Sequence, residues 1–202
     1  MIIKPIFSIG VGKATDIENL HVAKNIFVEN QNLFKLANGQ KLFRTTLKSY
    51  SPKYVDNLEY KNKEDIEQIK ESIRKKSIDY LTICGYKADV LEVKVHNIWL
   101  NEMEKNCVHE NHMHYGYTLS GCYYVEVPKN SGKIVFNDIN KVDSCNTLSI
   151  NEYTPYNSGS WSFVPEEGDM FFWKSTLQHE VPSSSFEGVR RSIAFDVIVT
   201  GI

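Results

Sequence analysis

The feature that most constrains the fold of this chain is a change of hydrophobic period near Val90. Beyond this residue, apolar and polar side chains alternate with a period of two, which is typical of a strand with one buried face. Similar short runs, separated by turn-rich segments, follow at 119–127, 133–137, 160–164, 170–173 and 191–200. Many short strands without intervening helices favour an antiparallel sandwich or barrel. We therefore predict a mainly β fold with flanking helices, a cupin-like double-stranded β-helix or jelly roll.

Strict alternation across residues 91–101 makes a further prediction about side-chain direction. It places Val93 and Val95 on the same face as Trp99 and Asn101. Tryptophans 99, 161 and 173 are all expected to build the barrel interior. Three carboxylates near strand positions, Asp138, Asp169 and Asp196, are expected to be turn or solvent residues instead.

The part of the chain before Gly85 contains helical patterns. The clearest helix is predicted to begin near Asn62, with acidic residues in its first turn, and to end at Gly85. Apolar residues recur close to helical spacing at Ile66, Ile69, Ile73 and Tyr80, which indicates packing against a sheet. We predict one domain over 1–202, with 1–88 as helical cover and edge strands and 89–202 as the core barrel.

Composition restricts the partners and the compartment of the protein. A formal net charge of -2 argues against binding to a nucleic acid through its phosphates. No apolar run is long enough to cross a bilayer. The four cysteines are widely spread without a C-x-x-C pair, which fits a reducing, cytoplasmic setting. We expect a cytoplasmic protein with a small-molecule or peptide substrate and no membrane or nucleic-acid partner, and the sequence is compatible with a homodimer.

The densest cluster of metal-ligand side chains lies at 109–114, directly before an apolar run. In an extended segment, His112 and His114 point the same way and can converge on one ion. His179 follows an apolar strand and can complete a facial triad that leaves positions open for substrate and oxygen. If the local strand is bulged, His109 or Glu110 could supply a ligand instead.

A candidate anion receptor lies downstream of the histidines. Arg190 and Ser192 project from one face of a predicted strand. A guanidinium beside a hydroxyl suits the far carboxylate of a dicarboxylic acid.

Six motifs in series resemble those of a family of 2-oxoglutarate/Fe(II)-dependent oxygenases. They are Trp99-Leu100-Asn101, His112-Met113-His114, 119–125, 131–136, 168–179 and 190–193. Residues 44–47 also resemble the family, so the likeness covers nearly the whole chain. It implies a jelly-roll core with the metal at the mouth of the barrel.

The resemblance also assigns roles to residues. It implies Fe(II) bound by His112, His114 and His179, and 2-oxoglutarate as cosubstrate. Residues 119–136 are similar to the prolyl hydroxylase branch, in which a tyrosine matching Tyr124 contacts 2-oxoglutarate. Ser120 is expected to assist there, with Asn101 as a weaker candidate. Most of the superfamily has H-x-D or H-x-E, and His114 takes the acidic position here, which makes the iron site more positive.

The implied reaction hydroxylates an unidentified substrate and releases succinate and CO2. Two alternatives remain open from the sequence: a cupin-like three-histidine metal dioxygenase that does not use 2-oxoglutarate, and a non-catalytic jelly-roll binding module. Arg190 and Ser192 favour the 2-oxoglutarate-dependent oxygenase over the cupin-like alternative. The polar segment 143–158 is a candidate lid or substrate loop.

Overall fold

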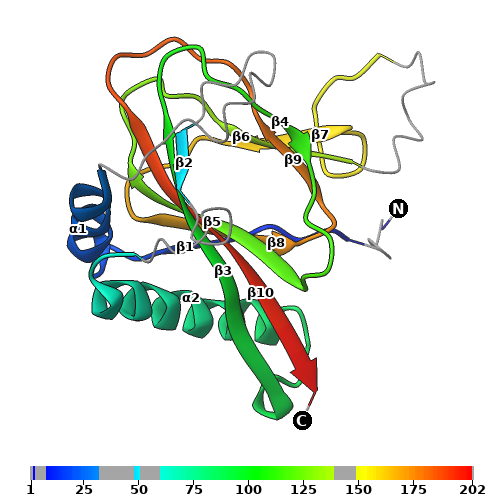
Figure 1. The fold of residues 1–202 in the computed structure, drawn as a ribbon. Helices are drawn as coiled ribbons and strands as arrows, with labels where there is room; N and C mark the ends of the chain where they lie inside the picture. The colour runs from blue at the N-terminus through cyan, green and yellow to red at the C-terminus, as the bar shows by residue number, and fades with distance from the viewer. Residues whose placement is uncertain (1, 3–7, 32–47, 51–59, 139–148, 202) are drawn as a thin grey trace.

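The computed structural model describes residues 2, 8–31, 48–50, 60–138 and 149–201, with the backbone alone for 48–50. In these ranges, two antiparallel sheets face each other (Figure 1). The larger sheet has the order β1 (Gly12–Thr15), β8 (Asp169–Lys174), β5 (Leu119–Glu126), β10 (Arg190–Gly201), β3 (Leu91–Met103) and β2 (Lys48–Tyr50). The smaller has the order β4 (His109–His112), β9 (Gln178–Val181), β6 (Ile134–Asn137) and β7 (Ser160–Phe163). This arrangement is the predicted jelly roll.

Strands β1, β4 and β9 were not predicted from the sequence. Each has only four residues, too few for a period of two to stand out from its surroundings. The last two carry His112 and His179, so the smaller sheet contributes most of the metal-ligand chemistry.

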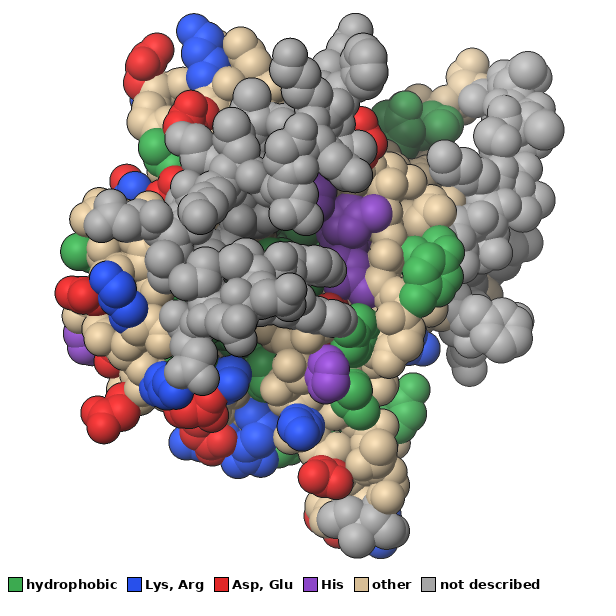
Figure 2. All heavy atoms as spheres, in the orientation of Figure 1, with side chains coloured by type: hydrophobic (Ala, Val, Ile, Leu, Met, Phe, Trp, Pro, Cys, Tyr) green, Lys and Arg blue, Asp and Glu red, His purple; other side chains and the backbone are tan. Residues whose placement is uncertain are grey.

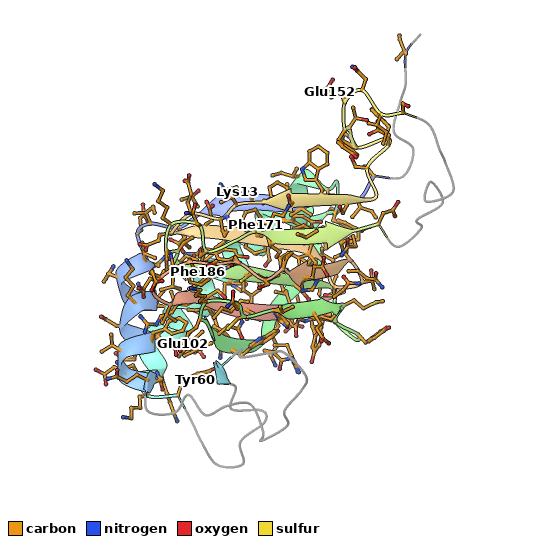
Figure 3. All side chains as sticks on the ribbon, turned by 90° about the horizontal axis from the view of Figure 1, so that it is seen from above. Lys13, Tyr60, Glu102, Glu152, Phe171 and Phe186 are labelled. Carbon is orange, nitrogen blue, oxygen red and sulfur yellow. The ribbon has the colours of Figure 1, made fainter. Side chains whose placement is uncertain are left out.

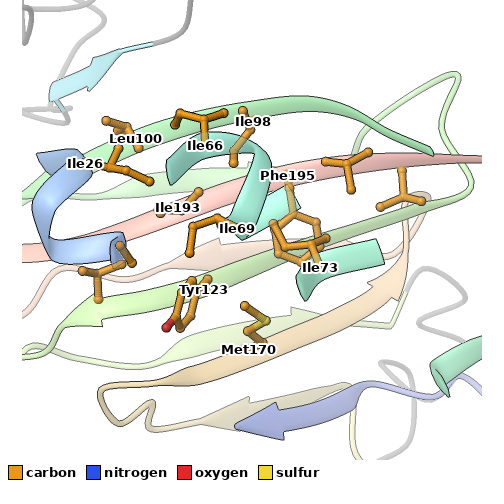
Figure 4. Packing of buried hydrophobic residues seen from close by; sticks show 14 of the residues in the cluster. Ile26, Ile66, Ile69, Ile73, Ile98, Leu100, Tyr123, Met170, Ile193 and Phe195 are labelled. Atoms are coloured by element: carbon orange, nitrogen blue, oxygen red, sulfur yellow. The ribbon is translucent and has the colours of Figure 1, made fainter. Parts of the chain in front are cut away.

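Two α-helices, α1 (Leu20–Asn30) and α2 (Lys63–Ile83), cover one face of the larger sheet (Figure 1). A 3-10 turn, Ala88–Val90, connects α2 to β3. Buried isoleucines of the helices pack on Ile193, Phe195 and Met170 of the sheet (Figure 4). This confirms that the apolar stripe of α2 is a packing surface. In the part of the chain that has been described, no helix has both the length and the apolarity needed to cross a membrane.

The ends of α2 lie close to the predicted positions. Asn62 is the N-cap residue, but it adopts a left-handed conformation with φ 57° and its side chain makes no capping hydrogen bond. At the other end, Gly85 has φ +85° and its N–H donates to the carbonyl of Thr82, while the Tyr86 N–H donates to that of Leu81. This pair of bonds is the Schellman ending that glycine favours.

The two faces of the larger sheet separate the core from the site. On β5 and β10, odd-numbered residues such as Tyr123, Ile193 and Phe195 face the helices. Even-numbered residues such as Tyr124 and Ser192 face the space between the sheets. This alternation confirms that Arg190 and Ser192 share a face, and that Tyr124 shares one with Cys122.

Strand β3 does not keep the strict alternation that the sequence suggested. Its register against β10 shifts between Asp196 and Val197, which pair with Asn97 and Val95. The extra residue, His96, is a β-bulge that reverses side-chain direction. The predicted shared face was therefore wrong: Val93 and Val95 pack under the helices, whereas Trp99 and Asn101 line the cavity between the sheets.

The prediction that the tryptophans build the barrel interior needs correction for one of them. Trp161 is 44 % exposed on β7 and does not build the barrel interior, because it lies on the edge strand of the smaller sheet. Trp173, on strand β8, is buried as predicted.

Residues 44–47 and part of the candidate lid, residues 143–148, lie outside the described residues. The described remainder of the candidate lid carries Glu152 and projects away from the sheets, while Phe171 lies among the strands (Figure 3).

Candidate active site

Two neighbouring strands and a connecting segment bring His179 together with the sequence neighbours His112 and His114. His112 ends β4 and pairs directly with His179 of β9. His114 lies two residues beyond β4, where its backbone N–H donates to the Ser175 carbonyl at 2.9 Å. One potential ligand atom from each of the three rings lies within 4.8 Å of the others. Histidine side chains are seen together near the middle of one face of the molecule in Figure 2.

The three imidazoles are held in the tautomer that a metal requires. The Nδ1 atom of His112 is 2.7 Å from the Glu110 carbonyl oxygen, and that of His179 is 3.0 Å from the Leu177 carbonyl. His114 Nδ1 is 2.6 Å from the carboxylate of Asp196. Because these oxygens only accept, each Nδ1 carries the proton and donates, which leaves the Nε2 lone pair available for a metal.

Burial favours the neutral form of two of the three clustered histidines, His112 and His179. Desolvation, followed by the neighbouring His112, lowers the pKa of His179 to about 3. Desolvation also lowers the pKa of His112, against the opposing effect of its hydrogen bond to the Glu110 carbonyl. Neutral imidazole is the form that binds metal, so these two side chains do not have to lose protons before an ion enters.

His109, the alternative ligand, is near the three rings but outside their cluster of ligand atoms. Its ring stacks on that of His112 with centroids 4.2 Å apart. Burial, followed by the charges of its neighbours, lowers the pKa of His109 to about 3. The side chain thus forms a neutral part of the cavity wall. Glu110 is exposed and contributes its backbone carbonyl to His112 rather than a ligand oxygen.

A buried guanidinium lies in the same cavity as the three histidines. Arg190 is 2 % exposed, and it donates to the Ser131 carbonyl at 3.0 Å and to the Tyr124 hydroxyl at 3.1 Å. Its Nε–H has no hydrogen-bond partner among the described residues, and none of their carboxylates forms an ion pair with it. An unpaired buried cation is costly, so this group suits an anionic ligand such as the far carboxylate of 2-oxoglutarate.

The remaining predicted cosubstrate residues divide between the two ends of the cavity. Ser192 and Asn101 line it, and Asn101 Oδ1 is buried without a partner in the described part of the chain. Ser120 does not accompany Arg190 as expected. Its hydroxyl lies 2.7 Å from Asp196, the partner of His114. Because Ser120 and Tyr124 are four residues apart on β5, they reach opposite ends of the site.

The prediction that Asp196 and Asp169 are turn or solvent residues was wrong. Both are buried, at 3 % and 2 % exposure, rather than solvent residues. Asp169 forms an ion pair with Lys13 at 2.9 Å, whereas Asp196 contacts His114. The available signal was strand parity, since Asp196 lies on the same face of β10 as Arg190 and Ser192.

Comparisons with known proteins agree with this geometry. A sequence model of the family described as "Putative 2OG-Fe(II) oxygenase" matches residues 97–196. This range includes all six motifs, from Trp99 to Ile193. No curated protein matches the sequence significantly.

Solved structures of oxygenases share the fold at low sequence identity. A prolyl-4-hydroxylase from Pseudomonas putida has a TM-score of 0.62 at 11% identity, over 94% of this chain and 92% of its own. The 2OG complex of the viral collagen prolyl hydroxylase from Paramecium Bursaria Chlorella virus-1 has a TM-score of 0.54 at 12% identity, over 93% and 94%. The non-heme alpha ketoglutarate dependent carbocyclase SnoK from nogalamycin biosynthesis has a TM-score of 0.64 at 10% identity, over 96% and 82%.

The family match over residues 97–196, together with the fold shared with these structures, indicates a 2-oxoglutarate/Fe(II)-dependent oxygenase. Residues 97–196 thus match a 2OG-Fe(II) oxygenase family, whose cofactors are Fe(II) and 2-oxoglutarate, and the structure contains three histidines that could hold the metal.

Proposed function

We propose that this protein is a dioxygenase in which His112, His114 and His179 hold Fe(II), and Arg190 binds the far carboxylate of 2-oxoglutarate. The observation that carries the proposal is that one cavity contains two groups that each lack a bonding partner. Three imidazoles present Nε2 lone pairs to a common point, and a buried guanidinium retains an unpaired donor. A metal-chelating dicarboxylic acid can satisfy both.

Each residue of the cavity has a separate task in this proposal. Tyr124 orients the guanidinium through its hydroxyl and also lies under it, with the Arg190 Cζ 4.9 Å from the ring centroid. Ser192 and Asn101 add polar groups along the wall. Trp99 stacks on His114, with ring centroids 5.6 Å apart, and shields that ligand from water.

Fe(II) together with 2-oxoglutarate would supply the activation of oxygen that hydroxylates a substrate, with release of succinate and CO2. The residues of this chain position the two groups and exclude water around them. The substrate in this proposal is a small molecule or peptide, and the whole chain acts as one domain, with 1–88 as cover and edge and 89–202 as the core barrel.

Anaerobic calorimetry tests the proposal with two variants and a matched control. His179→Ala should lose Fe(II) binding, whereas Arg190→Ala should keep the metal and weaken 2-oxoglutarate by at least about tenfold, because a charge-assisted anchor is lost. The neighbouring Arg191 faces the other way and pairs with Glu102 at 2.9 Å and Glu126 at 2.5 Å. Arg191→Ala should therefore retain the parent affinity for 2-oxoglutarate.

The possible outcomes separate the proposal from its two alternatives. Fe(II) binding without 2-oxoglutarate binding would reject the cosubstrate and leave a three-histidine dioxygenase of the cupin-like kind. The absence of stoichiometric metal would leave a non-catalytic binding module. If Arg190→Ala and Arg191→Ala bind 2-oxoglutarate equally well, the assignment of Arg190 is wrong.

A further inference from the structure

A buried carboxylate lies directly behind one of the three histidines. Asp196 is 3 % exposed, and its Oδ1 is 2.6 Å from Nδ1 of His114. The same oxygen is 2.7 Å from the Ser120 hydroxyl, and Oδ2 is 3.3 Å from the Asn97 side-chain amide. All three neighbours donate to it, so both of its oxygens act as acceptors, as those of an ionised carboxylate do.

This contact distinguishes His114 from the other two members of the cluster. His112 and His179 donate to backbone carbonyls of residues two positions before them. Those partners are neutral and come from local chain geometry. Asp196 is 82 residues away from His114 in the sequence and carries a charge, so only the tertiary structure could have provided it.

Side chains on the two strands that flank β10 hold the carboxylate of Asp196 in place. Asp196 pairs across β10 with Asn97 on one side and with Ser120 on the other. Asn97 lies directly opposite Asp196 in the unbroken part of the β3–β10 register. Ser120 has a single hydroxyl proton, which goes to the carboxylate because that group cannot donate. Ser120 therefore accepts from Ser175, whose Oγ is 2.9 Å away.

We propose that Asp196 is a positioning residue whose carboxylate gives His114 more negative character than the other two ligands of the metal site. This inference rests on the proposed function, because it assumes that the three histidines hold Fe(II). Three neutral imidazoles would leave both positive charges of the ion uncompensated. A carboxylate on the far nitrogen of one ring offsets part of that charge, fixes the ring orientation and raises the basicity of Nε2.

The first test uses the unmodified protein, loaded with Zn²⁺ as a diamagnetic probe. In proton–nitrogen NMR spectra of the imidazole groups, the Nδ1–H of His114 should resonate well downfield of those of His112 and His179, because only His114 donates to a charged acceptor. Three equivalent resonances would overturn the proposal without any variant having to fold.

The second test separates charge from hydrogen-bonding shape. Asp196→Asn retains an acceptor for His114 but removes the charge, and it should weaken Fe(II) binding in anaerobic calorimetry by about 10- to 100-fold. The reduction potential of the bound iron should rise, because the carboxylate favours the ferric state. Asn97→Ala is the matched control: it removes the longest contact to the same carboxylate, and it should change metal affinity by less than about threefold, because the bond is weak.

Circular dichroism of the metal-free proteins establishes that both variants are folded. Parent-like metal affinity and potential in Asp196→Asn would overturn the charge role, even if Fe(II) and 2-oxoglutarate bind as proposed. A parent protein that binds no Fe(II) would instead remove the proposed function, and this inference with it. The two failures are therefore distinguishable.

Discussion

The two faces of the larger sheet contain the same strands but differ in how they treat polar groups. On the helix-covered face, the tyrosine hydroxyls are satisfied: Tyr60, Tyr80 and Tyr123 each donate to a backbone carbonyl, at 2.9, 2.9 and 2.6 Å. On the face toward the smaller sheet, several buried polar atoms have no partner among the described residues. They are Arg190 Nε, Asn101 Oδ1 and Trp173 Nε1.

This difference shows which face was shaped by folding and which by ligand binding. An unsatisfied buried polar group costs free energy, so a face built only for stability would pair or exclude such groups. The inner face accumulates them in one cavity, where bound groups can complete them. We therefore expect apolar substitutions on the outer face to change stability, and substitutions of Arg190 or Asn101 on the inner face to change binding.

The largest expected effect is on the outer face. Ile69 is fully buried between α2 and the sheet (Figure 4), and Ile69→Ala should lower the free energy of unfolding by about 2–5 kcal/mol. Urea unfolding of the metal-free protein measures the change. The matched control, Ile83→Ala at the exposed end of the same helix, should cost less than about 0.5 kcal/mol. Equal losses in the two variants would contradict the packing described for α2.

The second-largest effect is the stabilisation expected when ligands fill the cavity on the inner face. Fe(II) with 2-oxoglutarate, each at 100 times its dissociation constant, should stabilise the folded protein by about 2.7 kcal/mol or more, because both bind only the native state. Anaerobic thermal unfolding measures this as a rise in the melting temperature. His179→Ala should show no rise. A rise in that variant equal to the parent's would place the metal elsewhere.

A smaller effect on stability is expected when the unpaired cation is removed. Arg190→Met replaces the guanidinium by an apolar chain, and the free energy of unfolding without ligands should stay within about 1 kcal/mol of the parent, because relief of the buried charge offsets the lost hydrogen bonds. The ligand-dependent stabilisation by 2-oxoglutarate should nevertheless disappear. A loss of several kcal/mol in the ligand-free variant would mean that Arg190 is a structural residue.

The smallest effect is expected on the edge of the smaller sheet. Trp161 is 44 % exposed, so Trp161→Ser should change the free energy of unfolding by less than about 0.5 kcal/mol. The matched Trp173→Ala, which empties a buried position in the cavity wall, should cost about 3–5 kcal/mol. Urea denaturation of both variants would expose an error if Trp161 proved the more costly of the two.

Sequence patterns predicted most of the fold and the principal residues of the candidate site. The jelly-roll class, six strands of the two sheets, the stripe of α2 and its glycine ending all follow from local periodicity and turn chemistry. The gathering of His112, His114 and His179, and the shared face of Arg190 and Ser192, agree with the spacing of ligand-type residues. Their roles in binding remain predictions that the experiments above address.

Local patterns failed where a contact depends on strand register. A period of two assumes an unbroken strand, so the bulge at His96 was missed, and Val93 and Val95 were assigned to the wrong face. Strands β4 and β9 were too short to be recognised, although their pairing brings His112 beside His179.

By itself, the sequence determined the types of side chain available and the face of each strand on which most of them lie, because these properties depend on neighbours a few positions away. The tertiary structure decided which of those side chains meet. Asp196 illustrates the division: its parity on β10 is local, but its contact with His114 needs the tertiary arrangement that brings two segments 82 residues apart together. Such an arrangement is set by the packing of the whole sheet, which no local pattern contains.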